Sequence, residues 1–158
     1  MAIAKVHVAS WQIAYRDIFP AEYLATLSVE QRKAQWTDTI GKAISQTFVA
    51  EINGEIVGFS CVGPCRDEGA QPTDFEIWAL YVIADYWKQG VGRELWLTSR
   101  SGALAKGARR ISLWAVAGNV RAINFYQRAG FACEEASLTS FELGGVEAQE
   151  FRFSQNLA

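Results

Sequence analysis

The stretch Trp87-Lys88-Gln89-Gly90-Val91-Gly92-Arg93-Glu94-Leu95 decides the fold of this 158-residue chain. It follows an apolar run over residues 77–82 that has the composition of a buried strand, and it opens a long helical pattern. Glycines at positions 90 and 92 leave no side chain between the backbone and an anion, and the free N–H groups of a helix start attract negative charge. The stretch predicts a phosphate-binding turn, although a Gly-x-Gly pattern also occurs in plain tight turns.

A second segment, Asn119-Val120-Arg121-Ala122-Ile123-Asn124-Phe125-Tyr126-Gln127-Arg128-Ala129-Gly130-Phe131, predicts an amphipathic helix closed by a glycine and followed by a strand. In this order and at this separation, the two segments resemble motifs A and B of the GNAT superfamily of acyl-CoA-dependent N-acetyltransferases. Residues 10–36 are similar to the amine-side helices of many bacterial members. The resemblance covers most of the chain and implies acetyl-CoA as co-substrate and a primary amine of a small molecule or peptide as acceptor.

Periodicity along the rest of the chain predicts a mixed α/β fold of the α+β type, with helices first and then one twisted sheet. Helical spacing covers residues 3–18, 22–27 and 29–36. Strands are expected at 47–51 and 55–62 around an Asn53-Gly54 hairpin turn, and residues 63–73 have the composition of a loop. The remaining elements are a strand at 75–82, a helix from 91 to about 106, a strand at 111–116, a helix at 119–128, and strands at 131–138 and 147–154.

Composition and charge favour one domain over residues 1–158, because a chain of this length buries about 70% of its unfolded surface in a single core. A net charge of -2 leaves no broad basic face for nucleic acid and suits a cationic amine. Because no apolar run is long enough to span a membrane and the start has no signal-peptide pattern, we expect a cytoplasmic protein without a membrane partner. Three cysteines and one histidine form no zinc-binding pattern, so no metal is expected.

The sequence departs from the family at its start. Members usually open with a strand, whereas this sequence begins in a helical pattern, so the first strand is expected to be missing. Whether this is a natural short form or the chain starts further upstream stays open. A strand left without its neighbour has unpaired backbone groups that a second subunit can pair, which suggests a homodimer.

The resemblance implies where acetyl-CoA binds. It places the pyrophosphate on the turn, at Lys88, Gln89, Gly90, Val91, Gly92 and Arg93. It places the pantetheine in a gap beside the preceding strand, along Leu80, Tyr81 and Val82, with the Val82 N–H polarising the thioester carbonyl. An ordinary buried parallel strand has the same composition. Many members carry Gln or Arg where this chain has Trp87, whose ring we expect to pack under the turn.

The second helix carries further candidates. Asn119 is placed to cap the helix, and the resemblance adds a contact to the cofactor. Asn124 and Arg128 are expected near the adenine or the phosphates. The resemblance gives Tyr126 the role of protonating the coenzyme A thiolate, since a phenol of pKa about 10 facing a thiol of pKa about 8.5 can return a proton with little barrier. The alternative for Tyr126 is a side chain packed against the sheet, as we expect for Phe125.

The proton acceptor for the amine is assigned to Glu76. Some members place a catalytic glutamate near the start of the corresponding strand, and others use a glutamate on the next strand, where this chain has Trp114. The alternative for Glu76 is an exposed carboxylate at a strand end.

The expected reaction is direct transfer in a ternary complex, without metal and without an acetylated enzyme. Cys61 and Cys65 leave a two-step route formally open, and a noncatalytic acyl-CoA sensor is the alternative function. A nucleotide-binding P-loop is excluded, because its lysine and serine or threonine pattern is absent. The identity of the amine stays open. Five aromatic residues form a candidate wall around it, although at least half are expected in the core: Trp11, Tyr15, Trp36, Trp78 and Trp114.

Overall fold

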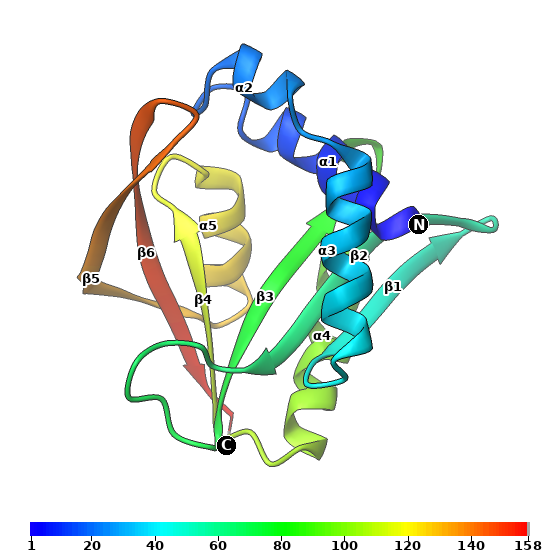
Figure 1. Cartoon of the computed structure of the whole chain (residues 1–158). Coiled ribbons are helices and arrows are strands. Elements are labelled where there is room, and N and C mark those ends of the chain that lie inside the picture. Colours follow the sequence, from blue (N-terminus) through cyan, green and yellow to red (C-terminus); the bar gives the residue numbers. More distant parts are fainter. Residues whose placement is uncertain (158) are drawn as a thin grey trace.

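The structure is a computed structural model that describes residues 1–157. It contains one six-stranded sheet of order β1-β2-β3-β4-β6-β5 (Figure 1). The strands are β1 (Gln46–Ile52), β2 (Glu55–Pro64), β3 (Asp74–Val82), β4 (Arg110–Val116), β5 (Ala132–Leu143) and β6 (Val146–Asn156). Only β3 and β4 are parallel; every other neighbouring pair is antiparallel. The mixed α/β architecture predicted from the sequence is confirmed.

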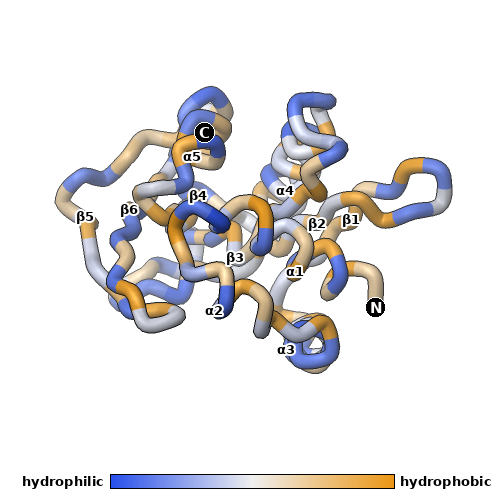
Figure 2. The backbone as a smooth tube through the Cα atoms, turned by 90° about the horizontal axis from the view of Figure 1, so that it is seen from above, coloured by the Kyte–Doolittle hydropathy of each residue, from blue (hydrophilic) through white to orange (hydrophobic). Residues whose placement is uncertain are grey.

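Helices cover both faces of this sheet, as the view from above shows (Figure 2). On one face lie α1 (Ala2–Ala14), α2 (Ala21–Ala25) and α3 (Val29–Gly41), and on the other lie α4 (Val91–Ala105) and α5 (Val120–Arg128). The first face buries an aromatic and aliphatic cluster of α1, α3, β2 and β3 around Phe59 and Trp36. The second buries a larger cluster around Trp96, Ile111 and Phe153. Both faces of the central strands are therefore apolar, which explains their continuous hydrophobic runs.

Local signals in the sequence mark several of the element ends. Asn53 and Gly54 have φ of 52° and 82°, the paired positive values of the predicted hairpin turn between β1 and β2. Ser28 begins α3 by accepting a hydrogen bond from the Gln31 N–H at 3.2 Å. Gly107, with φ of 87°, follows the end of α4 as predicted.

Other element ends differ from the prediction because long-range contacts set them. The first helix ends at Ala14, and the chain turns at residues 15–19, where Phe19 N–H bonds to the Tyr15 carbonyl. The expected loop at 63–73 loses its first two residues to β2, since Gly63 and Pro64 pair with β3. Strand β5 continues to Leu143 because β6 supplies partners along that length. A short 3-10 helix, Ala84–Tyr86, was not predicted.

Among residues 1–157, the first strand is β1, at one edge of the sheet, so the described chain opens in a helix as expected. The feature that positions the site is the contact between β3 and β4. Only Asp74 to Glu76 pair with Arg110 to Ser112, and beyond these three pairs no ladder joins the two strands. The parallel strands β3 and β4 therefore diverge toward their carboxyl ends and leave a wedge-shaped gap between them.

Candidate functional site

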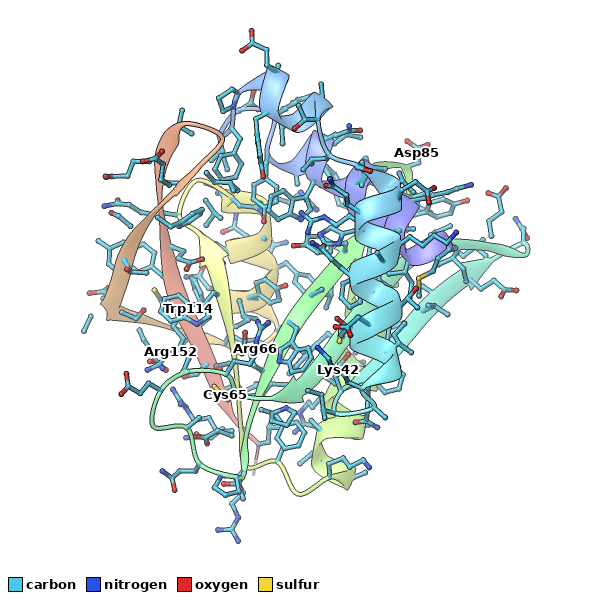
Figure 3. The ribbon with its side chains drawn as sticks, viewed as in Figure 1. Lys42, Cys65, Arg66, Asp85, Trp114 and Arg152 are labelled. Carbon is cyan, nitrogen blue, oxygen red and sulfur yellow. The ribbon has the colours of Figure 1, made fainter. Side chains whose placement is uncertain are left out.

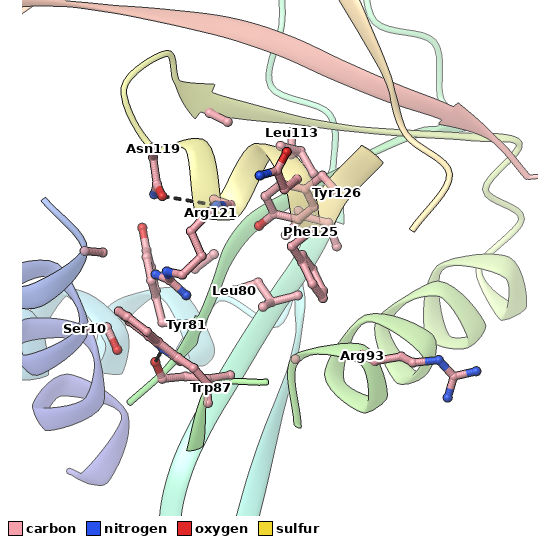
Figure 4. A pocket seen from close by; sticks show the side chains of 18 of the residues that line it. Ser10, Leu80, Tyr81, Trp87, Arg93, Leu113, Asn119, Arg121, Phe125 and Tyr126 are labelled. Carbon is pink, nitrogen blue, oxygen red and sulfur yellow. Dashed lines mark hydrogen bonds between the residues drawn. The ribbon is translucent and has the colours of Figure 1, made fainter. Parts of the chain in front are cut away.

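A pocket of about 790 Å³ occupies this wedge. Its walls are the diverging halves of β3 and β4, the start of α4, one side of α5, two residues of α1, and Tyr15, which follows α1 (Figure 4). Most of the predicted cofactor residues line it: Leu80, Tyr81, Val82, Lys88, Gly90, Gly92, Arg93, Asn119, Asn124 and Arg128. Tyr126 lines it too, while Gln89, Val91 and Glu76 do not. The fold therefore brings the two sequence motifs together around one cavity.

The turn before α4 presents unpaired donors to the pocket. Lys88 and Gly90 both have positive φ, 61° and 87°, so the backbone curls before the helix starts. The first helical hydrogen bond runs from the Glu94 N–H to the Gly90 carbonyl, and no side chain caps the helix. The N–H groups of residues 91–93 are consequently free to bind an anion, with the positive end of a 15-residue helix behind them.

Gly92 lies where the start of α4 faces α5. A Cβ added there would lie 3.4 Å from the Phe125 ring and 4.0 Å from a Leu80 methyl group, which are ordinary van der Waals distances. An alanine therefore fits at this position without displacing its neighbours.

Two basic side chains flank the turn as the sequence predicted, those of Lys88 and Arg93, and both residues line the pocket. Arg93 lies on the outer side of α4, pointing away from the cavity centre, and contacts Glu94 at 3.1 Å (Figure 4). Gln89 donates its side-chain N–H to the Asp85 carbonyl at 2.6 Å, which ties the turn to the short 3-10 helix.

Trp87 corrects a prediction. Its ring was expected under the turn, but it lines the pocket and its indole N–H donates to the Val82 carbonyl at 2.6 Å. The Arg121 guanidinium carbon lies 3.3 Å from the centre of the same ring (Figure 4). This stack joins the β3 wall to α5 across the wedge. Sequence reasoning missed Arg121, although the stripe of residues 121, 124, 125 and 128 on one side of α5 was a signal for it.

Three phenols line the pocket, of which those of Tyr15 and Tyr126 are buried and that of Tyr81 is half-buried. Burial raises the pKa of Tyr126, with a further rise from Tyr15, while the positive charge of Arg121 opposes the shift. Burial likewise raises the pKa of Tyr15 and of Tyr81. All three side chains are therefore protonated donors at neutral pH. The Tyr126 hydroxyl makes no hydrogen bond to another described residue, so it remains available to a ligand in the pocket.

Asn119 caps α5, as the sequence predicted, by accepting a hydrogen bond from the Ala122 N–H at 3.2 Å. Asn119 is 8% exposed and lines the pocket. The capping oxygen is used within the protein, which leaves the amide N–H₂ as the group that a cofactor can contact.

Glu76 is only 3% exposed, so the alternative of an exposed carboxylate at a strand end is wrong. The residue also does not line the pocket. One carboxylate oxygen accepts hydrogen bonds from the backbone N–H and the Nε of Arg66, at 3.1 Å and 3.0 Å. The other oxygen contacts a terminal nitrogen of the same guanidinium. The Arg66 guanidinium also lies 4.9 Å above the Trp78 ring, so loop and strand are fixed to each other.

The aromatic wall is divided between pocket and core. Trp78, Trp114 and Tyr15 line the pocket, whereas Trp36 is buried and donates to His7 Nδ1 at 3.0 Å. Trp114 donates to Asp67, which also pairs with Arg152, so Arg66, Trp114 and Arg152 gather on one face of the sheet (Figure 3).

Other groups that carry chemistry contribute no second centre. Residues 1–157 contain no cluster of three His, Cys, Asp or Glu side chains arranged for a metal ion. Cys61 is fully buried, and neither Cys61 nor Cys65 lines the main pocket. Within the same residues, no helix is both long and apolar enough to cross a bilayer.

Comparisons with known proteins agree with this geometry. The model of the Acetyltransferase (GNAT) family matches residues 9–131. A Bacillus subtilis protein named as an uncharacterised N-acetyltransferase, YuaI, is 32% identical over 149 residues, which cover 94% of this chain and 82% of that protein. The mycothiol acetyltransferase of Streptomyces avermitilis is 30% identical over 116 residues, 73% of this chain and 35% of that enzyme.

Solved structures show the same fold. The ribosomal-protein-alanine N-acetyltransferase of Brucella melitensis superposes with a TM-score of 0.74 at 21% identity, covering 98% of this chain and 94% of that one. The PaiA N-acetyltransferase of Thermoplasma acidophilum, solved in complex with coenzyme A, superposes with a TM-score of 0.75 at 19% identity, covering 98% and 90%.

Proposed function

Because this chain belongs to the Acetyltransferase (GNAT) family, whose enzymes take their acetyl group from acetyl-CoA, we propose that it transfers that group directly to a primary amine of a small molecule or peptide. The observation that carries the proposal is the pocket in which free helix N–H groups, the unpaired edge of β3 and a buried tyrosine meet. These supply three requirements of acyl transfer: a held thioester, an oxyanion donor and a proton for the leaving thiolate.

The pyrophosphate binds the N–H groups of residues 91–93, with Lys88 and Arg93 adding positive charge. The pantetheine enters the wedge beside Leu80 to Val82, where the edge of β3 that faces β4 is unpaired. Asn119, Asn124 and Arg128 contact it or the adenosine from α5. When bound, acetyl-CoA supplies the activated acetyl group.

Val82 provides the oxyanion donor in this proposal. The Ile83 N–H is bonded to the Val57 carbonyl of β2, and successive residues of a strand direct their N–H groups to opposite edges. The N–H of Val82 is therefore directed toward the wedge. There it stabilises the negative charge that develops when the amine nitrogen attacks the thioester carbonyl.

Tyr126 then gives its phenolic proton to the sulfur as the carbon–sulfur bond breaks. Its raised pKa keeps the phenol protonated over the working pH range, as an acid requires. Glu76 remains the candidate proton acceptor for the ammonium group. Its contacts with Arg66 occupy both carboxylate oxygens, so the proton reaches it only through water or after Arg66 moves.

Exchanging Glu76 for Gln tests this assignment. We expect turnover to fall most at low pH, where the amine is most fully protonated. An unchanged pH profile would remove Glu76 from the mechanism. Arg66→Gln is the matched variant, because it frees the carboxylate without removing it.

Initial rates of thiol release, measured while acetyl-CoA and an amine are both varied, test the direct route. Intersecting double-reciprocal lines are expected for a ternary complex, and parallel lines would indicate an acetylated enzyme. Full burial of Cys61 and the position of Cys65 outside the main pocket support the direct route. Intact-mass measurement after incubation with acetyl-CoA alone should show no added acetyl group.

A further inference from the structure

The pocket has an uneven distribution of charge. Four cationic side chains line it, Lys88, Arg93, Arg121 and Arg128, and no Asp or Glu does. Two of these border the phosphate-binding turn, and Arg128 lies near the end of α5. Arg121 instead sits in the first turn of α5, stacked on Trp87, and forms no ion pair among residues 1–157. It is a cation with no assigned partner.

The groups near Arg121 are hydrogen-bond donors. Ser10, on α1, is only 2% exposed, lines the pocket, and its hydroxyl has no hydrogen-bond partner. The Tyr81 phenol lies at the same end (Figure 4), Tyr15 lines the same pocket, and the charge of Arg121 acts on the Tyr15 phenol. A guanidinium without an ion pair and a buried hydroxyl without a hydrogen-bond partner line the same pocket, and together they suit an oxyanion, since burying a hydroxyl without a partner is costly.

The position of these donors separates them from the cofactor phosphates. Ser10 lies in α1 and Tyr15 directly follows it, on the opposite face of the sheet from α4, whose first turn offers the free N–H groups. Figure 4 shows Arg121 over Trp87 and beside Tyr81, on the α1 side of the cavity. An anion bound here therefore belongs to the second ligand of the pocket.

The proposed reaction also requires an amine in this pocket, because the acceptor nitrogen attacks the thioester carbonyl. An anion site on the α1 side of the cavity therefore matches an acceptor that carries both an amino group and a carboxylate.

We propose that the acceptor is a small amine with a carboxylate close to its amino group, of the amino acid class, and that Arg121 binds this carboxylate together with Ser10. The inference rests on the proposed acetyltransferase function. Arg121 is then a specificity-determining residue, and simple polyamines are poor substrates because the pocket opposes a purely cationic ligand.

The test compares each of the common L-amino acids with its own amide, which keeps the amine and neutralises the carboxylate. Thiol release from acetyl-CoA gives kcat/KM for both. We expect at least one amino acid to be acetylated about ten- to a hundredfold more efficiently than its amide, the range for a charge-assisted hydrogen bond. Arg121→Gln should abolish that ratio, Arg121→Lys should retain part of it, and Arg16→Gln, at an exposed arginine outside the pocket, should keep all of it.

Acetyl-CoA affinity, measured by calorimetry on the same variants, separates this inference from the proposed function. If Arg121 binds the acceptor, the Arg121→Gln variant should bind acetyl-CoA with the same affinity as the unaltered chain. Weaker cofactor binding with an unchanged acid-to-amide ratio would assign Arg121 to a phosphate and overturn it. Acetyl-CoA binding without preference for any amino acid also overturns it, whereas no acetyl-CoA binding at all refutes the proposed function instead.

Discussion

Gly90→Ala should weaken acetyl-CoA binding through the backbone of the turn alone. Gly90 has φ of 87°, and a Cβ added there has no heavy atom within 4 Å. An L-residue in this left-handed conformation costs about 1–2 kcal/mol, and relaxing the strain turns the following N–H groups away from a bound phosphate. If most of this strain energy is subtracted from the free energy of acetyl-CoA binding, the dissociation constant rises about tenfold, since 1.4 kcal/mol corresponds to a factor of ten.

Gly69→Ala is the matched control. Gly69 has φ of 76°, an added Cβ there also meets nothing within 4 Å, and it lies on the β2–β3 loop outside the main pocket. Urea unfolding should show a similar loss of stability for both variants, about 1–2 kcal/mol. Calorimetric titration should show weaker acetyl-CoA binding for Gly90→Ala only. Equal affinities in the two variants would refute the argument that the turn backbone holds the phosphate.

Three further outcomes are expected. Tyr126→Phe should lower kcat by about a hundredfold with acetyl-CoA affinity unchanged, as loss of a general acid does, and a fall in affinity instead would make Tyr126 a packing residue. Burial lowers the pKa of His7 to about 3, so the unfolded chain takes up the proton first. About 2.6 kcal/mol of stability should therefore be lost between about pH 7.5 and pH 4.5; unfolding of His7→Leu at the two pH values should lack this loss. The Ser60 and Ser99 hydroxyls are fully buried and 2.7 Å apart. Ser99→Ala should cost about 1–3 kcal/mol in thermal unfolding by leaving Ser60 unpaired, and adding Ser60→Ala should restore part of it.

The order of the elements was predictable because short-range signals determine it. Asn53-Gly54 adopts the positive φ values that a two-residue hairpin requires, and Asn119 caps α5 with its own side chain. The glycine at position 90 likewise has the left-handed conformation that begins α4. Each of these depends on a few neighbouring residues, so a single sequence contains the information.

The splay of β3 from β4 was implied by resemblance and not by composition. An apolar strand has the same residues whether its neighbour pairs with it or diverges, and only the three-pair register between the strands settles the difference. Strand ends such as Pro64 and Leu143 depend in the same way on partners far along the chain.

Side-chain partners within the site were the least predictable. Arg66 lies in a loop segment without periodicity, so its pairing with Glu76 ten residues later has no sequence signature. Arg121 reads as an ordinary exposed arginine in a first helical turn, and only the fold brings the Trp87 ring beneath it. These contacts change the interpretation of the site most, since one restrains the candidate base and the other supplies a candidate for acceptor recognition.

Calorimetric titration of the chain with acetyl-CoA, with ATP as the parallel control, tests the central claim most directly. We expect acetyl-CoA to bind with a dissociation constant on the order of micromolar and ATP to give no response, because the wedge accepts pantetheine while the turn lacks the P-loop residues that hold a triphosphate. Absence of heat with acetyl-CoA, or equal binding of ATP, would contradict the claim that the pocket between β3 and β4 is an acyl-CoA site.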